Sequence, residues 1–261
     1  AGNNDITTAG YDAKPEEEPE EEPEAPEAAV EQKGLVFDSE DGDYVQVQGA
    51  VKTPTTVEVR VKLDSKDADT GKRQIIMNNY YDHNPGEGGN DCEQGPGKGG
   101  KSWGLEVNAK NQLRLWEDTG GNHNIHFSEL GNICDDQWKL ISLVRDKENK
   151  KVIVYINGEK QTEVAVEGFQ DAKLDNWLCF GSDYHKNPIY LDGEINEVRM
   201  WSDVRTDAEI EEYSTKSVEG NEDGLAHAWS FASANGAEGS KKVYSDTVFA
   251  DKVKTGGFAV K

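Results

Sequence analysis

The sequence has little of what would place a protein in a membrane or on nucleic acid. No apolar run approaches the roughly 18 residues that a membrane-spanning helix needs, and no signal peptide is recognisable. Basic residues are scarce: 28 lysines and arginines stand against 51 aspartates and glutamates, which gives a formal net charge of −23. Because this charge repels phosphate, we expect no nucleic-acid partner. The lack of a long apolar run leads us to expect no transmembrane segment.

Cysteine is also scarce, with only three in 261 residues. Cys179 lies within an apolar run and is predicted to be a buried thiol. Cys92 and Cys134 lie beside loop sequence and would be able to pair in an exported protein, a choice that the sequence leaves open. No CxxC pair or cysteine–histidine cluster has the spacing of a zinc site.

Motifs of common hydrolases and of calcium-binding loops are missing as well. No G-x-S-x-G sequence is present, and the stretch from His123 to His126 lacks the glutamate and the helix of a zinc protease. The stretch from Asp38 to Asp43 looks like the start of an EF-hand loop, but its acid and glycine spacing differs and no ligand glutamate follows. The sequence therefore gives no support to these classes.

Residues 1–33 differ in composition from the rest of the chain. Glutamate and proline dominate, as in PEEEPEEEPEAPEAA at residues 15–29, which offers almost nothing to bury. Charge repulsion and proline should keep such a segment extended, so we predict a disordered acidic linker. A spacer between a domain and a surface and a plain interdomain linker fit the composition equally well.

Residues 34–261 carry the pattern of one all-β domain. Residues 57–63 read VEVRVKL, an alternation that places apolar side chains on one strand face and charged side chains on the other. Short strands with turn signals between them, such as Asn157-Gly158, are typical of a sandwich. Other strands are predicted at residues 35–37, 44–47, 74–77, 103–107, 112–116, 125–127, 138–145, 151–156 and 225–231.

The stretch from Leu178 to Trp201 is predicted to form two strands around which the other strands pack. It reads LCFGSDYHKNPIYLDGEINEVRMW, in which two apolar runs flank a polar loop. A short helix that carries Ile210 and Tyr213 is predicted directly after it, with Asp203 or Thr206 as the cap. The tryptophans that lie in strand patterns are predicted to be core residues: Trp103, Trp138, Trp201 and Trp229.

These residues resemble the laminin-G-like or pentraxin-like branch of the concanavalin A-like jelly rolls. The matching pieces are Phe180-Gly181, the run LDGEINEVRMW from Leu191 to Trp201, and residues 205–210. Residues 33–47 are similar to the opening strand pair of the family, and residues 138–161 to one of its hairpins. The resemblance covers most of residues 33–232 and implies a two-sheet antiparallel jelly-roll sandwich. It says little about the ligand, because this fold hosts many functions.

Glycanases of the same superfamily place paired acids on one strand as E-x-D-x-E. The nearest stretch here is Glu194-Ile195-Asn196-Glu197, in which asparagine replaces the central acid. Strict alternation would put Glu194 and Glu197 on opposite strand faces. We therefore predict that the chain is not an enzyme, with glycan cleavage as the least favoured alternative.

The resemblance to pentraxins implies a site on one sheet face, where the loop after an early strand joins the loop just before the G-x-I strand that starts at Gly193. A single Ca²⁺, which needs six to eight oxygen ligands, would be held by Asp82 and Asp183, with Asn79 adding an amide oxygen. Aromatic and amide side chains of the same loops suit a sugar, unless the tyrosines only cover the rim of the sandwich. The predicted ligand-binding residues are Asn79, Tyr80, Tyr81, Asp82, His83, Asp183, Tyr184, His185 and Asn187.

Two further groups of side chains are candidates for binding. Three near a neighbouring glycine pair would extend the sugar site: Trp116, His123 and His126. Three acids would form an alternative structural calcium site, or merely a solvated turn: Asp41, Asp43 and Asp246.

Together these features predict a non-catalytic carbohydrate-binding or adhesion module of an exported bacterial protein. Its partner would be a glycan or a glycosylated surface. The alternative is a protein-binding adhesion domain that grips its partner with the long loop at residues 78–102. The acidic spacer resembles the tether of bacterial surface lipoproteins, so we expect an extracellular or cell-surface location, with a lipid carried upstream of this chain.

Overall fold

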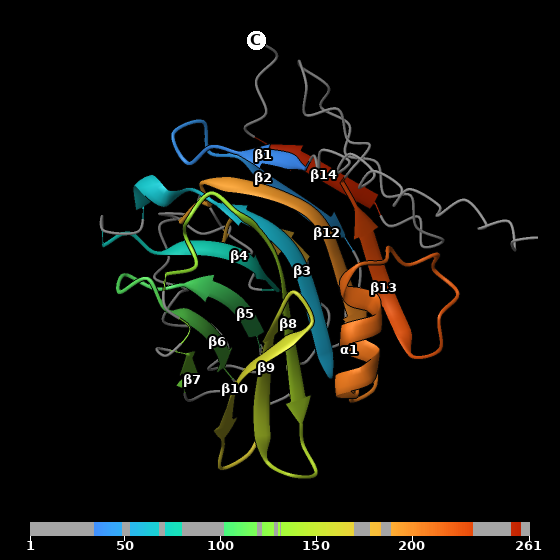
Figure 1. Ribbon diagram of the computed structural model, residues 1–261. Coiled ribbons are helices and arrows are strands. Elements are labelled where there is room, and N and C mark those ends of the chain that lie inside the picture. Colours follow the sequence, from blue (N-terminus) through green and yellow to red (C-terminus); the bar gives the residue numbers. More distant parts are fainter. Residues whose placement is uncertain are drawn as a thin grey trace, which may run out of the picture. The chain divides into compact units, whose positions relative to one another are not determined.

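The computed structural model describes residues 34–48, 53–67, 71–79, 102–118, 122–127, 130, 132–169, 178–183, 189–231 and 252–256. In this part of the chain, two antiparallel seven-stranded sheets pack against each other over one shared core (Figure 1). The predicted two-sheet jelly-roll sandwich with one short helix is therefore confirmed. The linker predicted at residues 1–33 lies outside the described residues.

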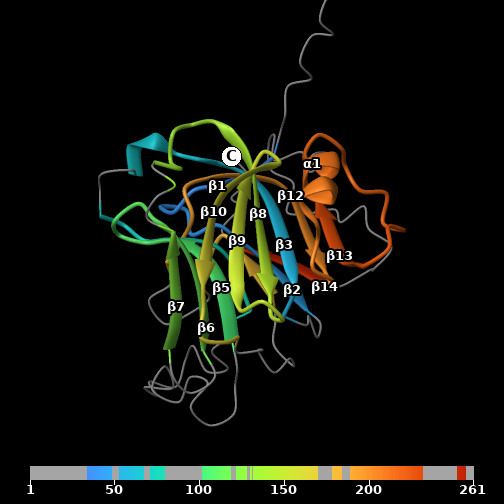
Figure 2. The same ribbon diagram turned by 60° about the horizontal axis from the view of Figure 1, so that its bottom comes forward.

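Sheet A has the strand order β1-β12-β3-β8-β9-β10, and β13 also pairs with β12. Figure 2 shows these strands side by side, with β12 and β3 next to each other. Their bounds are β1 Leu35–Phe37, β3 Thr56–Leu63, β8 Trp138–Asp146, β9 Lys151–Ile156, β10 Glu159–Ala165, β12 Gly193–Trp201 and β13 Leu225–Ser230.

Sheet B has the strand order β14-β2-β11-β4-β5-β6-β7. Its strands are β2 Tyr44–Gln48, β4 Gln74–Asn78, β5 Ser102–Val107, β6 Leu113–Asp118, β7 Asn122–Phe127, β11 Leu178–Phe180 and β14 Lys252–Gly256. A single-turn 3₁₀ helix at Ser65–Asp67 follows β3. Strand β14 pairs along β2, whereas the sequence pattern shows only a weakly apolar tail after residue 231.

The inward faces of both sheets build the core, as the alternating pattern predicts. In β3 the apolar side chains are each at most 1% exposed: Val57, Val59, Val61 and Leu63. Trp103 and Trp229 belong to the core, whereas Trp201 is buried on the outer face of sheet A. The prediction for Trp138 is wrong: it is only partly buried and pairs with the outward Lys62, whose ammonium lies 5.5 Å from the ring centre.

Helix α1 (Asp207–Ser214) covers part of the outer face of sheet A. Thr206 and Glu209 form a capping box at its start, which settles the predicted choice of cap. Ile210 packs with the buried side chains Val144, Ile153 and Tyr155. The Tyr155 hydroxyl donates to Asp207 Oδ1 at 2.6 Å, so the first turn of the helix is tied to β9.

The described cysteines lie inside the molecule. Cys179 is 1% exposed, and burial, reinforced by the charge of Asp183, raises the pKa of its thiol. The prediction of a buried thiol is thus confirmed. Cys134 is also buried, but Cys92 lies outside the described residues, so their pairing stays a prediction. No helix in the described ranges has the length and apolar composition needed to cross a bilayer.

Candidate functional site

The outer face of sheet B carries a compact set of polar and aromatic side chains. Along β5, β6 and β7 every second residue enters the core, for example Leu105, Leu115 and Ile125. The residues between them therefore share the outer face, because side chains alternate along a strand. Strand pairing places them in two adjacent rows: Gly104, Trp116 and Asn124 in one, and Glu106, Arg114 and His126 in the next.

The indole of Trp116 lies directly on the backbone of Gly104. A Cβ atom built at Gly104 would stand 2.6 Å from Cε2 and Nε1 of the ring and 2.7 Å from Cζ2. Such distances are closer than van der Waals contact, so only glycine lets the ring settle on the strand at this point. The ring remains partly exposed, and the adjacent Asn124 is exposed.

Two arginines hold one buried carboxylate in the second row. Arg73 contacts Glu106 through Nε at 3.2 Å from Oε1 and Nη2 at 2.6 Å from Oε2. Arg114 Nη2 lies 2.5 Å from Oε1 of the same group. The Glu106 side chain is 0% exposed, while those of Arg73 and Arg114 are 41% and 19% exposed. The hydrogen bond to Glu106 raises the pKa of Arg73, and the charge of Asp183 adds to this.

His126 completes the second row as a neutral ring. Its Nδ1 lies 3.1 Å from the amide nitrogen of Asn108. Because an amide nitrogen only donates, Nδ1 accepts, and the neutral ring carries its hydrogen on Nε2. Burial and the charge of Arg114 lower the pKa of His126, which favours the same neutral form.

Two residues of the predicted pentraxin-like site are described, and the side-chain oxygens of both accept hydrogen bonds from backbone N–H groups. Asn79 is buried, and its amide oxygen accepts from the Trp103 N–H at 2.6 Å. Asp183 Oδ1 accepts from the Ile189 N–H at 2.8 Å and so closes the loop between them. The other predicted ligand residues lie outside the described residues: Tyr80, Tyr81, Asp82, His83, Tyr184, His185 and Asn187.

The segment that carries Asp183 borders the outer face of sheet B. Asn78 stands next to Gly104 in the strand pairing, and its amide nitrogen donates to the Ser182 carbonyl at 2.7 Å. Asp183 is close enough for its charge to act on Arg73. The predicted loop at residues 182–188 thus starts beside the face that carries Trp116, whereas the amide oxygen of Asn79 binds the Trp103 N–H.

Two of the alternative calcium residues, Asp41 and Asp43, lie at the turn between β1 and β2. Asp43 Oδ2 accepts from the Asp38 N–H at 3.0 Å, and the Asp43 N–H donates to the Asp38 carbonyl at 3.2 Å. Asp41 is exposed, and Asp246 lies outside the described residues. Within the described ranges, no group of three or more histidine, cysteine, aspartate or glutamate side chains is arranged to hold a metal ion.

The carboxylates of β12 lie differently from the prediction. The pairing of β12 with β3 shifts between Ile195 and Glu197, which marks a β-bulge at Asn196. This extra residue turns Glu197 to the same outer face of sheet A as Glu194, so the prediction of opposite faces is wrong. Glu194 forms an ion pair with Lys62, and Glu197 is 4% exposed.

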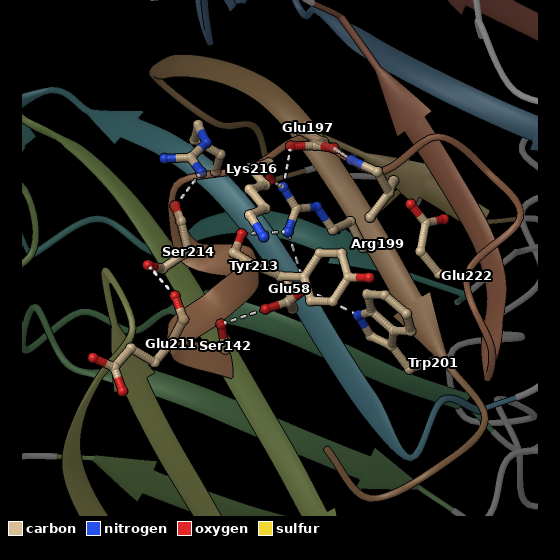
Figure 3. Close-up of polar contacts among 12 residues, drawn as sticks. Glu58, Ser142, Glu197, Arg199, Trp201, Glu211, Tyr213, Ser214, Lys216 and Glu222 are labelled. Carbon is tan, nitrogen blue, oxygen red and sulfur yellow. Dashed lines mark hydrogen bonds and ion pairs between the residues drawn. The ribbon is translucent and has the colours of Figure 1, made fainter. Parts of the chain in front are cut away.

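Glu197 belongs to a buried ionic network beneath α1, shown in Figure 3. Arg199 lies between two carboxylates, with Nη2 2.7 Å from Glu197 Oε2 and Nη1 3.4 Å from Glu58 Oε2. Ser142 and the Trp201 indole N–H both donate to Glu58 at 2.9 Å. Burial opposes the charge of Arg199, but these two carboxylates outweigh it and raise its pKa.

The same network closes the end of the helix. Arg199 Nη1 donates to the Tyr213 carbonyl and Arg60 Nη2 to the Ser214 carbonyl, each at 2.8 Å. These carbonyls lie at the C-terminal end of α1, where backbone acceptors lack partners within the helix. No basic residue stands in the last turn of α1, so the strands below supply the positive charge that this end favours. The prediction of a charged outer face at Arg60 is confirmed.

Sequence reasoning found part of the row on sheet B and missed the rest. Trp116 and His126 were expected beside a glycine-rich loop, whereas they project from the sheet; the side chain of His123 lies outside the described residues. Gly104, Glu106 and Arg114 were not singled out. One signal was present, because a glycine inside an apolar strand pattern such as SWGLEV marks a close approach by another group.

Comparison with known proteins agrees with the observed fold. A family model described as the concanavalin A-like lectin/glucanases superfamily matches residues 38–211. A candidate carbohydrate-binding protein from Bacteroides ovatus is similar in structure, with a TM-score of 0.54, 18% identity and 86% of this chain covered. This chain spans 57% of the length of that protein. A heptameric pentraxin from Limulus polyphemus gives a TM-score of 0.49 and 13% identity over 85% of this chain and 92% of its own. A search of curated proteins finds no significant match.

Proposed function

Because the chain belongs to the concanavalin A-like lectin/glucanases superfamily, we propose that it is a non-catalytic module that binds carbohydrate on the outer face of sheet B. The observation that carries this proposal is the partly exposed indole of Trp116, seated on Gly104. We place the module on an exported, surface-attached protein, with residues 1–33 as its spacer. The acidic, proline-rich composition of that segment supports this placement.

The face around Trp116 has the chemistry that a sugar requires. An aromatic ring packs against the C–H surface of a sugar, while a few fixed polar groups orient the hydroxyls. Asn124 lies directly across from Trp116, and His126 and Arg114 stand in the adjacent row. Gly104 holds the ring in one place, so the binding surface exists before the ligand arrives and less ordering is needed on binding.

The state of the carboxylates supports binding without cleavage. A glycanase needs two carboxyl groups on either side of the scissile bond. On the outer face of sheet B, Glu106 is fully buried between two arginines. Glu58 and Glu197 share Arg199 beneath α1. These carboxylates are engaged in ion pairs, so we propose recognition rather than catalysis.

The proposal is tested with a glycan array, followed by calorimetry on the sugars that bind. Replacing Trp116 with alanine should weaken binding at least about tenfold, because stacking and burial of the ring are lost. Trp138→Ala is the matched control, since Trp138 is a partly exposed tryptophan on the other sheet. Equal affinities in Trp116→Ala and the wild type would refute this site, and an array without any bound glycan would refute the function.

Calcium dependence stays part of the proposal, with Asp82, Asp183 and Asn79 as the candidate ligands. A metal that binds only the folded protein raises the unfolding midpoint by mass action. We expect the midpoint in millimolar Ca²⁺ to exceed that in excess EDTA, and the difference to vanish in Asp82→Ala. Asp82 is the better test, because Asp183 also closes its own loop. Identical midpoints with and without Ca²⁺ would exclude a calcium site.

A further inference from the structure

The outer face of sheet B holds more hydrogen-bond donors than its own acceptors can take. Each guanidinium group carries five N–H donors and no acceptor, whereas one carboxylate accepts about four hydrogen bonds. Arg73 and Arg114 both converge on the single carboxylate of Glu106. The carboxylate is 0% exposed, while both arginine side chains reach the surface. A visiting ligand therefore meets the donors of this cluster and not its carboxylate.

The neutral acceptors beside this cluster are already engaged within the protein. Asn108 Oδ1 accepts from the backbone N–H groups of Lys110 and Gln112, at 2.8 and 3.1 Å. Gln112 Oε1 accepts from the Asn108 side chain at 3.0 Å. His126 Nδ1 accepts from the same amide, which leaves Nε2–H as an outward donor. The row next to Trp116 thus presents donors, and its two arginines exceed the charge of Glu106 by one. Asp183 also lies near enough for its charge to act on Arg73, but it belongs to the neighbouring loop and not to this row.

This surplus selects among sugars. A sugar hydroxyl both donates and accepts hydrogen bonds. On a row of donors, a neutral sugar could use its hydroxyl oxygens as acceptors, but some of its hydroxyl hydrogens would find no acceptor in the protein. A carboxylate or sulfate only accepts, and guanidinium groups bind such anions with short, charge-assisted hydrogen bonds. Arg114 precedes Trp116 by two positions on β6, which corresponds to about 7 Å along the strand. One oligosaccharide can therefore stack on the ring and reach the arginines.

We propose that the ligand of this site is an anionic glycan whose carboxylate or sulfate is bound by Arg73 and Arg114 next to the sugar stacked on Trp116. The inference rests on the proposed carbohydrate-binding function and narrows its ligand class. The protein carries 51 acidic against 28 basic residues overall, so general attraction to anions does not explain such a preference. A preference for anionic glycans must therefore come from the arrangement of Arg73 and Arg114, and mutation of these two arginines should remove that preference.

The test measures binding of three probes by calorimetry: an oligogalacturonate, its fully methyl-esterified form and a sulfated oligosaccharide. The ester keeps the backbone and removes the charge. We expect the acid to bind at least about tenfold more tightly than its ester, as hydrogen bonds to charged groups imply. Binding of the sulfated probe instead would identify sulfate as the anion and also support the proposal.

The variants are chosen so that a folding defect cannot imitate the result. Arg73→Gln alters the more exposed arginine, and Arg114→Gln with Glu106→Gln removes one positive and one negative charge together. Both should bring the affinities for acid and ester within about twofold of each other. Lys147→Gln in the β8–β9 turn makes the same charge change as Arg73→Gln and should leave the preference intact.

Equal binding of the acid and the ester, lost in Trp116→Ala but unchanged in Arg73→Gln, would overturn this inference and leave the proposed function standing. Absence of binding to any glycan would overturn both. A preference for the anion that persists in both arginine variants would also overturn the inference, because these arginines would then not supply it.

Discussion

The position of the Trp116 ring depends on the glycine at residue 104, which has no side chain. The ring occupies the space that a Cβ of residue 104 would need, so the packing of this ring, rather than the backbone conformation, requires glycine at this position. The sequence showed a tryptophan in a predicted strand, but its contact with Gly104 depends on the register between β5 and β6. Local patterns do not specify register between strands.

Replacing Gly104 with alanine is expected to displace the indole and weaken glycan binding about tenfold. The added methyl group would lie 2.6 Å from the ring, and overpacking of this kind costs about 1–3 kcal/mol. Calorimetry gives the affinity, and tryptophan fluorescence reports the moved ring. Gly168→Ala is the control, because nothing lies within 4 Å of a Cβ there. Unchanged affinity and emission in Gly104→Ala would contradict the arrangement.

His126 should titrate below the ordinary histidine value of about 6.5. Burial and the charge of Arg114 lower its pKa, with a further contribution from Lys110, while Glu106 opposes the shift. The folded protein therefore binds this proton less readily than the unfolded chain does. It follows that this residue makes the folded state less stable as the pH falls through about 6.5.

Proton NMR of the His126 ring measures this pKa directly. Urea unfolding at about pH 7.5 and about pH 5.5 tests its consequence. The wild type should lose more unfolding free energy on acidification than His126→Gln does. A pKa at or above the ordinary value, or equal losses in the two proteins, would contradict the lowering of the His126 pKa by burial and Arg114.

At the scale of the elements, helix α1 is held at both ends by side chains from distant strands. Tyr155 of β9 binds its first turn, and Arg199 of β12 binds the carbonyls at its last turn. The sequence was sufficient to predict the helix and to narrow its cap to Asp203 or Thr206, because capping residues and Ile210 are local signals; the structure selects Thr206. It did not predict the arginine closure, since those partners lie on other elements.

Arg199→Met should destabilise the fold by about 3–5 kcal/mol, because two buried carboxylates would lose their shared partner. Chemical denaturation of the unliganded protein measures the difference. Lys216→Met is the control: its ion pair with Glu212 is more than half exposed, and the change should cost less than about 1 kcal/mol. A loss near zero for Arg199→Met would mean that the network is not required for stability.

The bulge in β12 shows why strict alternation failed at one point. Val198 and Met200 enter the core and Ile195 does so too, which is possible only if β12 carries one extra residue between them relative to β3. Asn196 takes that place, and its carbonyl accepts from the Phe231 N–H at 2.6 Å. A period-two pattern assumes an unbroken ladder, so it predicted the strand correctly and misjudged the face of one carboxylate.

For the whole molecule, the two sheets form one stability unit. They share a continuous core, and the buried pair of Glu117 on β6 and Arg145 on β8 joins them through charge as well. The sequence predicted this architecture well, because apolar periodicity and turn signals recur along residues 34–231. It predicted the proposed binding face poorly, since that face depends on how strands lie side by side.

Deleting residues 1–33 is expected to leave the unfolding midpoint and the glycan affinity unchanged, because the segment has almost no apolar side chains to bury. Differential scanning calorimetry of the full chain and of residues 34–261 tests this, and each should show one transition. A lower midpoint in the shorter chain would show that the acidic segment stabilises the sandwich. A changed affinity would place it at the binding face.

Strand β12 pairs with β3 and β1, both near the start of the sandwich, and with β13, near its end. Residues 56–63 can pair with β8 on one side as soon as residues 138–146 are present, but their ladder on the other side requires residues 193–201. Pairings so distant in sequence make folding slow, and a chain emerging from the ribosome would keep β3 partly unpaired until β12 had followed. The sandwich must assemble late, after most of the chain has been synthesised, and a chain that ended before Trp201 would leave its first strands open to aggregation.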